Sequence, residues 1–134
     1  MPSTARKSDS FEWNNEAEVF NFVGHSFDVQ AAKELIRQKP RKVGMMNISG
    51  LVGLVGDPPV DGGSYRMTFG ITVNWDKAQS DDVDLDFPCI LVPWRDSALP
   101  IDGWHRVAKA KIKGQSEVPY VILTKKELKQ IYSR

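Results

Sequence analysis

The sequence holds a single cysteine, has no long hydrophobic run and carries almost no net charge. One cysteine, Cys89, cannot form a disulfide within the chain or a zinc site of several cysteines, so we expect a cytoplasmic location. No apolar run approaches the roughly 20 residues that cross a bilayer, which predicts that the protein has no membrane partner. A net charge of +1 over 134 residues argues against binding of nucleic acid by bulk charge alone.

The composition is that of one ordinary globular domain. Because 41% of the residues are hydrophobic and 26% are charged, the chain resembles neither a disordered nor a fibrous sequence. No internal repeat or low-complexity segment interrupts it. Residues 1–10 are polar and lack periodicity, so we expect a disordered tail there and a single domain over residues 11–134.

The small net charge conceals an uneven distribution. Residues 1–103 hold ten basic and fifteen acidic side chains, a net −5, whereas residues 104–134 hold eight basic and two acidic side chains, a net +6. A basic segment of this kind is typical of a surface that faces an anionic ligand, although exposed lysines more often serve solubility. Nucleic acid therefore remains a possible partner through residues 104–134.

Helical and strand patterns alternate without a strict order. A helix is predicted over residues 29–38 after the capping residue Asp28, a second over residues 104–113, and a third after the capping-box sequence that begins at Thr124. Short apolar runs predict strands at residues 89–92, 99–101 and 118–123. We expect an α+β fold: a compact single domain with a small mixed sheet and flanking helices.

The region around residues 43–76 predicts an inserted β-hairpin. Residues 43–56 are apolar and broken by glycines, and a strong turn signal follows at residues 57–63. Met67–Trp75 then alternates apolar and polar side chains, as a half-buried strand does. If this strand is a free edge, it could pair with a second copy, so a homodimer is left open.

The most informative stretch is a strand that enters the turn Asp102-Gly103 and leaves as a helix. The first N–H groups of a helix attract anions, and a glycine at the entrance lets a phosphate approach the backbone. Arg106 offers a bidentate fork and His105 an adjustable donor. Asp102 could orient the histidine, hold Mg²⁺ or simply cap the helix.

A helical wheel separates two sides of the 104–113 helix. One side is apolar and is expected to face the core, with Trp104, Val107, Ala108 and Ile112. The other side is basic and is expected to face a ligand, with Arg106, Lys109 and Lys113, while His105 lies at the boundary. We therefore predict that Lys109 joins the phosphate-binding residues.

The order of these motifs resembles the ParB/sulfiredoxin superfamily, or ParB-like nuclease domain. The resemblance rests on Pro88-Cys-Ile-Leu-Val, on Ile101-Asp-Gly-Trp-His-Arg-Val-Ala-Lys-Ala and on Val118-Pro-Tyr-Val-Ile, with Phe27-Asp-Val-Gln-Ala-Ala-Lys-Glu-Leu-Ile upstream. It covers about residues 25–40 and 87–132. Residues 43–80 match nothing in the family pattern.

The resemblance implies a nucleotide-phosphate site at the Gly-x-His-Arg turn. Carried over, Gly103, His105 and Arg106 become contacts to the phosphates of ATP or another nucleotide. Sulfiredoxins have their catalytic cysteine at the position of Trp104, so their reductase activity is not expected here. The Asp-Gly-x-His-Arg form is closest to members similar to free-serine kinases, which implies that Asp102 and His105 are catalytic.

Two classes of function follow. The first is a nucleotide-dependent hydrolase, nuclease or small-molecule phosphotransferase in which Asp102 holds Mg²⁺. The alternative is a non-catalytic accessory module of the plasmid or phage type that binds DNA or a partner protein. Whether the protein is an enzyme is left open.

Other residues have simpler explanations. Asp82, Asp84 and Asp86 alternate with apolar residues and fit a solvated strand edge better than a metal site, because their spacing of about 6.5 Å is too wide for one ion. We expect His25 to be an incidental loop residue and Cys89 to be a small buried hydrophobe. Among the tryptophans, Trp75 and Trp104 are expected in the core and Trp94 at the surface.

Overall fold

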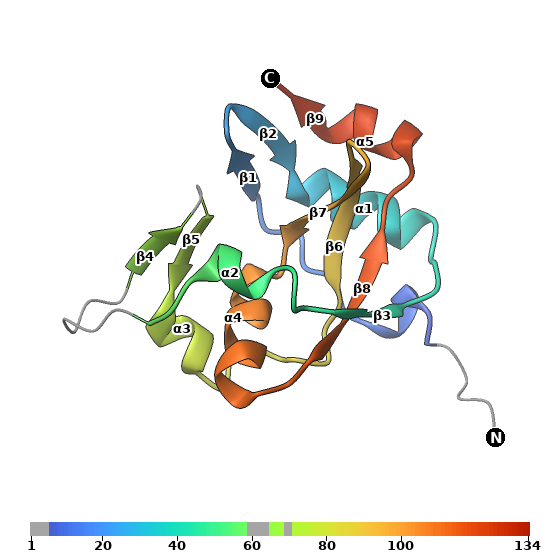
Figure 1. Cartoon of the computed structure of the whole chain (residues 1–134). Helices are drawn as coiled ribbons and strands as arrows, with labels where there is room; N and C mark the ends of the chain where they lie inside the picture. Colours follow the sequence, from blue (N-terminus) through green and yellow to red (C-terminus); the bar gives the residue numbers. More distant parts are fainter. Residues whose placement is uncertain (1–5, 59–64, 69–70) are drawn as a thin grey trace.

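The central element of the fold is a four-stranded sheet in the order β3-β8-β6-β7 (Figure 1). The structure is a computed structural model that describes residues 6–58, 65–68 and 71–134. The strands are β3 (Gly44–Asn47), β8 (Glu117–Ile122), β6 (Cys89–Trp94) and β7 (Ser97–Asp102). β6 runs parallel to β8 and antiparallel to β7, and β3 is antiparallel to β8. The prediction of an α+β fold with a mixed sheet is confirmed.

A second, smaller sheet lies at one end of the molecule. It contains β1 (Val19–Phe22), β2 (His25–Asp28) and β9 (Tyr132–Ser133). The helices α1 (Val29–Gln38) and α5 (Lys125–Ile131) lie close to this sheet (Figure 1). Both helices begin as predicted, because the Asp28 side chain accepts a hydrogen bond from Ala31 N at 2.9 Å and Thr124 forms a capping box with Glu127.

The N-terminal segment differs from the expected tail over residues 1–10. Ser8 is fully buried, and its N–H donates to Arg41 O at 2.7 Å while its hydroxyl accepts from Arg41 N at 2.8 Å. The Trp13 indole N–H donates to Ser8 O at 2.8 Å. Residues 6–10 are therefore anchored, because the N–H and the hydroxyl of Ser8 both bond to the backbone of Arg41, which lies 33 residues later in the chain. Residues 1–5 lie outside the described residues.

The predicted hairpin around residues 43–76 is wrong in its pairing. β3 joins the central sheet instead of pairing with the later strand, and a short helix, α2 (Val52–Val55), follows it. The hairpin consists of β4 (Tyr65–Thr68) and β5 (Ile71–Asn74), so residues 67–75 are not one strand. Trp75 begins helix α3 (Trp75–Gln79), because the Asn74 side chain accepts from Asp76 N and Lys77 N and caps it.

The alternating aspartates do not form the expected strand. Residues 81–87 form turns, in which Asp86 N donates to the Asp84 carboxylate at 2.9 Å and Phe87 N donates to Asp84 O at 3.2 Å. An aspartate that accepts from the backbone two residues later stabilises a turn, so local side-chain bonding prevailed over the alternation of apolar residues.

Helix α4 (Trp104–Lys113) has the predicted bounds but not the predicted faces. Lys109 is 8% exposed, whereas Ile112 is 45% exposed. The helix contacts β8 on one side and α2, α3 and β5 on another, so the inserted segment covers part of the side expected to face a ligand. Within the described part of the chain, no helix is long and apolar enough to cross a membrane.

Candidate functional site

The turn between β7 and α4 packs tightly against β6. Gly103 is the N-cap of α4 and has a φ of +108°, in the region that favours glycine. A Cβ atom at this position would lie 2.4 Å from Cys89 Sγ and 2.8 Å from Cys89 Cβ. Cys89 is fully buried as predicted, and burial raises the pKa of its thiol to about 11. The thiol therefore serves as packing beneath the turn.

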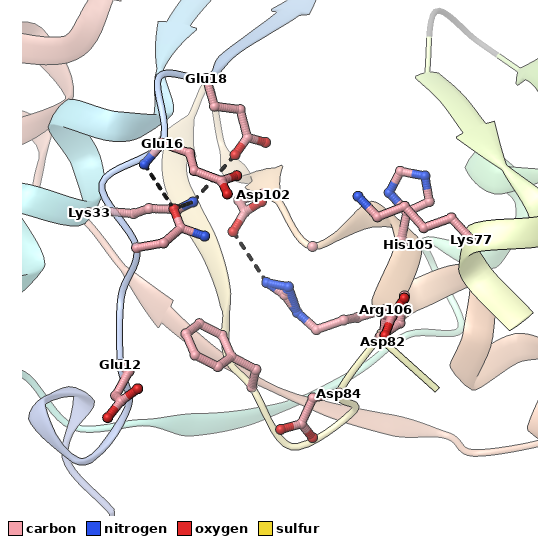
Figure 2. A pocket seen from close by; sticks show the side chains of 14 residues that line it. Glu12, Glu16, Glu18, Lys33, Lys77, Asp82, Asp84, Asp102, His105 and Arg106 are labelled. Carbon is pink, nitrogen blue, oxygen red and sulfur yellow. Dashed lines mark hydrogen bonds and ion pairs between the residues drawn. The ribbon is translucent and has the colours of Figure 1, made fainter. Parts of the chain in front are cut away.

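A cleft of about 360 Å³ opens at the N-terminus of α4 (Figure 2). One wall is the N-terminal strap, which we define as residues 11–18; this segment forms no helix or strand. Side chains of α1 hold it through hydrogen bonds from Gln30, Lys33 and Arg37. The opposite wall is α3, which contributes Lys77. The exposed Asp82 and Asp84 lie at the rim, and Val83 and Phe87 also line the cleft. Asp102, Gly103, His105 and Arg106, all predicted from sequence, line the cleft together.

Asp102 and Arg106 form an ion pair in the cleft. The Arg106 Nη2 atom lies 3.2 Å from Asp102 Oδ2, and the two side chains are 14% and 16% exposed. The guanidinium also lies over the Phe87 ring, 5.3 Å from its centroid. Arg106 Nε is buried and has no hydrogen-bond partner among the described residues. Asp102 therefore orients the arginine, which leaves this donor of the guanidinium unused.

His105 is held as a neutral acceptor. Its Nε2 atom lies 3.2 Å from the backbone N of Asn74, and a backbone N–H only donates, so Nε2 must be unprotonated. Burial lowers the pKa of His105 below 6.5, as do the nearby charges of Lys77 and Arg106, and Asp102 offsets part of this effect. At neutral pH the ring therefore carries its proton on Nδ1.

Lys109 lies outside the cleft, unlike the prediction. Its ammonium donates to the carbonyl oxygens of Ser80 and Val83, each at 2.8 Å. The helical wheel placed Lys109 with Arg106 on a solvent-facing side, but α3 and the turn that follows it cover that position.

The basic segment does not form one surface. Lys111 donates to the carbonyls of Val52 and Gly56 and pairs with Asp57, so it also holds the inserted segment. The exposed lysines Lys125 and Lys126 belong to α5, at the opposite end of the molecule from the hairpin (Figure 1). Nucleic-acid binding through residues 104–134 stays a prediction, and several of its charges already serve packing.

Two lysines of the cleft were not predicted. Lys33 of α1 is only 5% exposed, and its Nζ lies 3.0 Å from Asn14 Oδ1 and 3.3 Å from Glu18 Oε1. The sequence did carry a signal, because Lys33 stands on the buried stripe of α1 with Val29 and Ile36. Lys77 had no comparable signal, since its place depends on how α3 docks.

The cleft contains more negative than positive groups. Its cations are Lys33, Lys77 and Arg106, and its carboxylates are Glu12, Glu16, Glu18, Asp82, Asp84 and Asp102 (Figure 2). Asp102 and Glu18 are paired with cations, and Glu12, Glu16, Asp82 and Asp84 are exposed to solvent. Among the described residues no group of three or more carboxylate, histidine or cysteine side chains is placed to hold a metal ion.

The remaining candidates lie away from the cleft. His25 belongs to β2, not to a loop, and its Nδ1 lies 2.6 Å from the Tyr132 hydroxyl. Trp94 is half-buried, with its ring centroid 5.4 Å from that of Phe27. Trp75 and Trp104 are core residues, as predicted.

Comparisons with known proteins add no relative: no family model, no curated protein and no solved structure matches the chain. The likeness to the ParB/sulfiredoxin superfamily therefore rests on the motifs alone, and stays a prediction.

Proposed function

We propose that the cleft binds the phosphate groups of a nucleotide, ATP or another, as its Mg²⁺ complex. The observation that carries the proposal is that Lys33, Lys77 and Arg106, from three helices, line the same cleft as the glycine turn that opens α4. Gly103, the N-cap of this helix, lines the cleft and has no side chain to cap it, so we expect the first N–H groups of α4 to be available to an anion. Amides, a guanidinium and ammonium groups are the donors that phosphate requires.

The excess of carboxylates supports Mg²⁺ as part of the ligand. A phosphate alone would meet six carboxylates against three cations. Mg²⁺ commonly binds through one or two carboxylates together with substrate phosphates and water. Asp102, the predicted metal ligand, is paired with Arg106, so we assign the Mg²⁺ contact to the exposed rim carboxylates Asp82 and Asp84.

Isothermal titration calorimetry tests the binding. ATP, ADP and CTP are titrated with and without Mg²⁺ into the wild type, Lys77→Met and the control Lys126→Met, which removes the same charge from α5. We expect Mg²⁺-dependent binding that weakens at least about tenfold in Lys77→Met and stays unchanged in Lys126→Met. Failure of all three nucleotides to bind, or equal losses in the two variants, would overturn the proposal.

The protein is either an enzyme or a non-catalytic module, and a measurement of turnover distinguishes the two. In a hydrolase, nuclease or phosphotransferase, Arg106 and Mg²⁺ would neutralise the charge of the transferred phosphoryl group, and His105 would donate from Nδ1. A non-catalytic module would bind the nucleotide without releasing phosphate. A phosphate-release assay with wild type and Arg106→Lys, run beside a DNA-cleavage gel, distinguishes these outcomes. Sedimentation of the same sample tests whether the chain forms the homodimer that the sequence left open.

A further inference from the structure

Helix α3 is fastened to α4 at both of its ends. His105 Nε2 accepts from the backbone N of Asn74, the N-cap of α3, at 3.2 Å. Lys109 Nζ donates at 2.8 Å to the carbonyl of Ser80, the C-cap of α3, and to that of Val83. His105 and Lys109 are four residues apart, so they share one face of α4. This face therefore clamps the whole length of α3.

Helix α3 needs this support. It spans only five residues, and a helix so short is unstable without tertiary contacts. Its buried residues Trp75 and Ala78 supply packing, while Lys77 is exposed and lines the cleft. Figure 2 shows Lys77 beside His105 on the same side of the cleft. The direction of the Lys77 side chain thus depends on how α3 is docked.

Lys109 also fixes the turn that follows α3. Lys109 is 8% exposed, and the hydrogen bonds that satisfy its ammonium within the described residues are those to the two carbonyls. A buried charge without partners is costly, so the ammonium and the turn over residues 80–83 hold each other in place. Asp82 lies within this turn and Asp84 directly after it, and both line the cleft.

We propose that His105 and Lys109 are positioning residues, which fasten α3 and the following turn as one wall of the cleft so that Lys77 and Asp82 reach the ligand. The contacts of His105 and Lys109 with α3 do not depend on a ligand, whereas their effect on nucleotide affinity rests on the proposed function. Lys109 then acts on binding through α3 and does not touch phosphate.

Hydrogen exchange of the protein without ligand tests the fastening. In Lys109→Met, amides of residues 75–83 should exchange at least about tenfold faster than in the wild type, while those of α1 keep their rate. Lys109→Arg retains the donors and should restore protection. His105→Leu should accelerate exchange at Asn74, and His105→Gln, whose amide oxygen can accept, should do so less. Unchanged exchange in both Lys109→Met and His105→Leu would overturn the proposal.

A double-mutant cycle tests the effect on the ligand. The affinity for Mg²⁺–ATP is measured in the wild type, Lys77→Met, Lys109→Met and the double variant. If Lys109 acts through α3, removal of Lys77 costs much less affinity in the Lys109→Met background than in the wild type. Additive losses would mean that Lys109 affects binding independently of Lys77, and would overturn the positioning role. If the wild type binds no nucleotide, the proposed function fails while hydrogen exchange still decides the fastening.

Discussion

The two walls of the cleft are held by different kinds of bond. The N-terminal strap is tied by Lys33, which contacts the side chains of Asn14 and Glu18, and the Glu18 side chain is 45% exposed. The α3 wall is tied by Lys109, whose ammonium bonds two backbone carbonyls in the interior. Both lysines are buried, but one pairs with a carboxylate at the solvent boundary and the other with fixed dipoles.

This difference shows that a lysine's role depends on what surrounds its ammonium group. Salt screens the pair of Lys33 and Glu18, whereas a buried bond to a carbonyl is screened much less. We therefore expect the strap to respond to ionic strength and the α3 wall to respond to changes that remove its donor or acceptor. The predictions below test this distinction, beginning with the turn at Gly103, which lines the cleft together with both walls.

The largest effect is expected at the Gly103 turn, which packs on Cys89. Gly103→Ala places a Cβ atom 2.4 Å from Cys89 Sγ at a φ of +108°, so backbone strain and overpacking together should lower the free energy of unfolding by about 3 kcal/mol. The control is Gly114→Ala, where φ is +71° but no atom lies within 4 Å, so only strain of about 1 kcal/mol is expected. Urea denaturation measures both, and equal losses would contradict the close packing at Gly103.

A smaller loss is expected when the α3 wall is released. Lys109→Met leaves two carbonyls without their donor and should lower the free energy of unfolding by about 2 kcal/mol. Because the bonds are buried, the loss should be nearly the same in low and high salt. Lys113→Met, at an exposed position of the same helix, is the control and should cost little. A loss that disappears in high salt would place Lys109 at the surface.

As the pH is lowered, the α3 wall should lose stability before the ion pair between Arg41 and Glu127 does. The native pKa of His105 lies below its unfolded value of 6.5, so the unfolded chain binds more protons between those two values. The free energy of unfolding should therefore fall as the pH drops through the range just below 6.5, and be fully recovered above it. His105→Gln should remove this dependence; a wild type as flat as the variant would contradict the buried acceptor.

The ion pair between Arg41 and Glu127 should be lost at a lower pH than the contact of His105. The hydrogen bonds from Arg41 hold the pKa of Glu127 below 4.5, so its stabilising contribution is present above pH 4.5 and is lost as the pH falls further. Urea denaturation at a series of pH values should show this second loss in the wild type, and not in Glu127→Gln.

The smallest effect is expected at the strap. Lys33→Met should cost about 1 kcal/mol or less, because the partner carboxylate of Glu18 is half-exposed, and the cost should shrink when salt is added. Denaturation in 0.05 and about 0.5 M NaCl measures this change, since the Debye length falls from above 10 Å to a few ångströms. A salt-independent cost would show that the two walls are held alike.

Features that depend on neighbouring residues were predicted well. Asp28 and Thr124 cap helices as expected, and Gly114 ends α4 in a left-handed conformation. The turn at Asp102-Gly103 was likewise correct, because a strand, a glycine and an amphipathic helix follow one another directly in the sequence. Capping and turn chemistry act over a few residues, so the sequence contains all that they need.

Features that depend on distant segments were predicted poorly. Ser8 was assigned to a tail because its burial depends on Arg41, and β3 was paired with the wrong strand because β8 lies about 70 residues later. Lys109 was assigned to a ligand because a helical wheel assumes one covered side, whereas α4 is covered by β8 and by α3.

The sequence by itself therefore determined the class of fold, the helix ends and the turn that gathers Asp102, Gly103, His105 and Arg106, since these follow from local backbone and side-chain chemistry. Only the tertiary structure decided that Lys33 and Lys77 join that turn while Lys109 turns away from it. The reason is physical: an ammonium group goes where its desolvation is compensated, and the carbonyls and carboxylates that compensate it come from segments far apart in the chain.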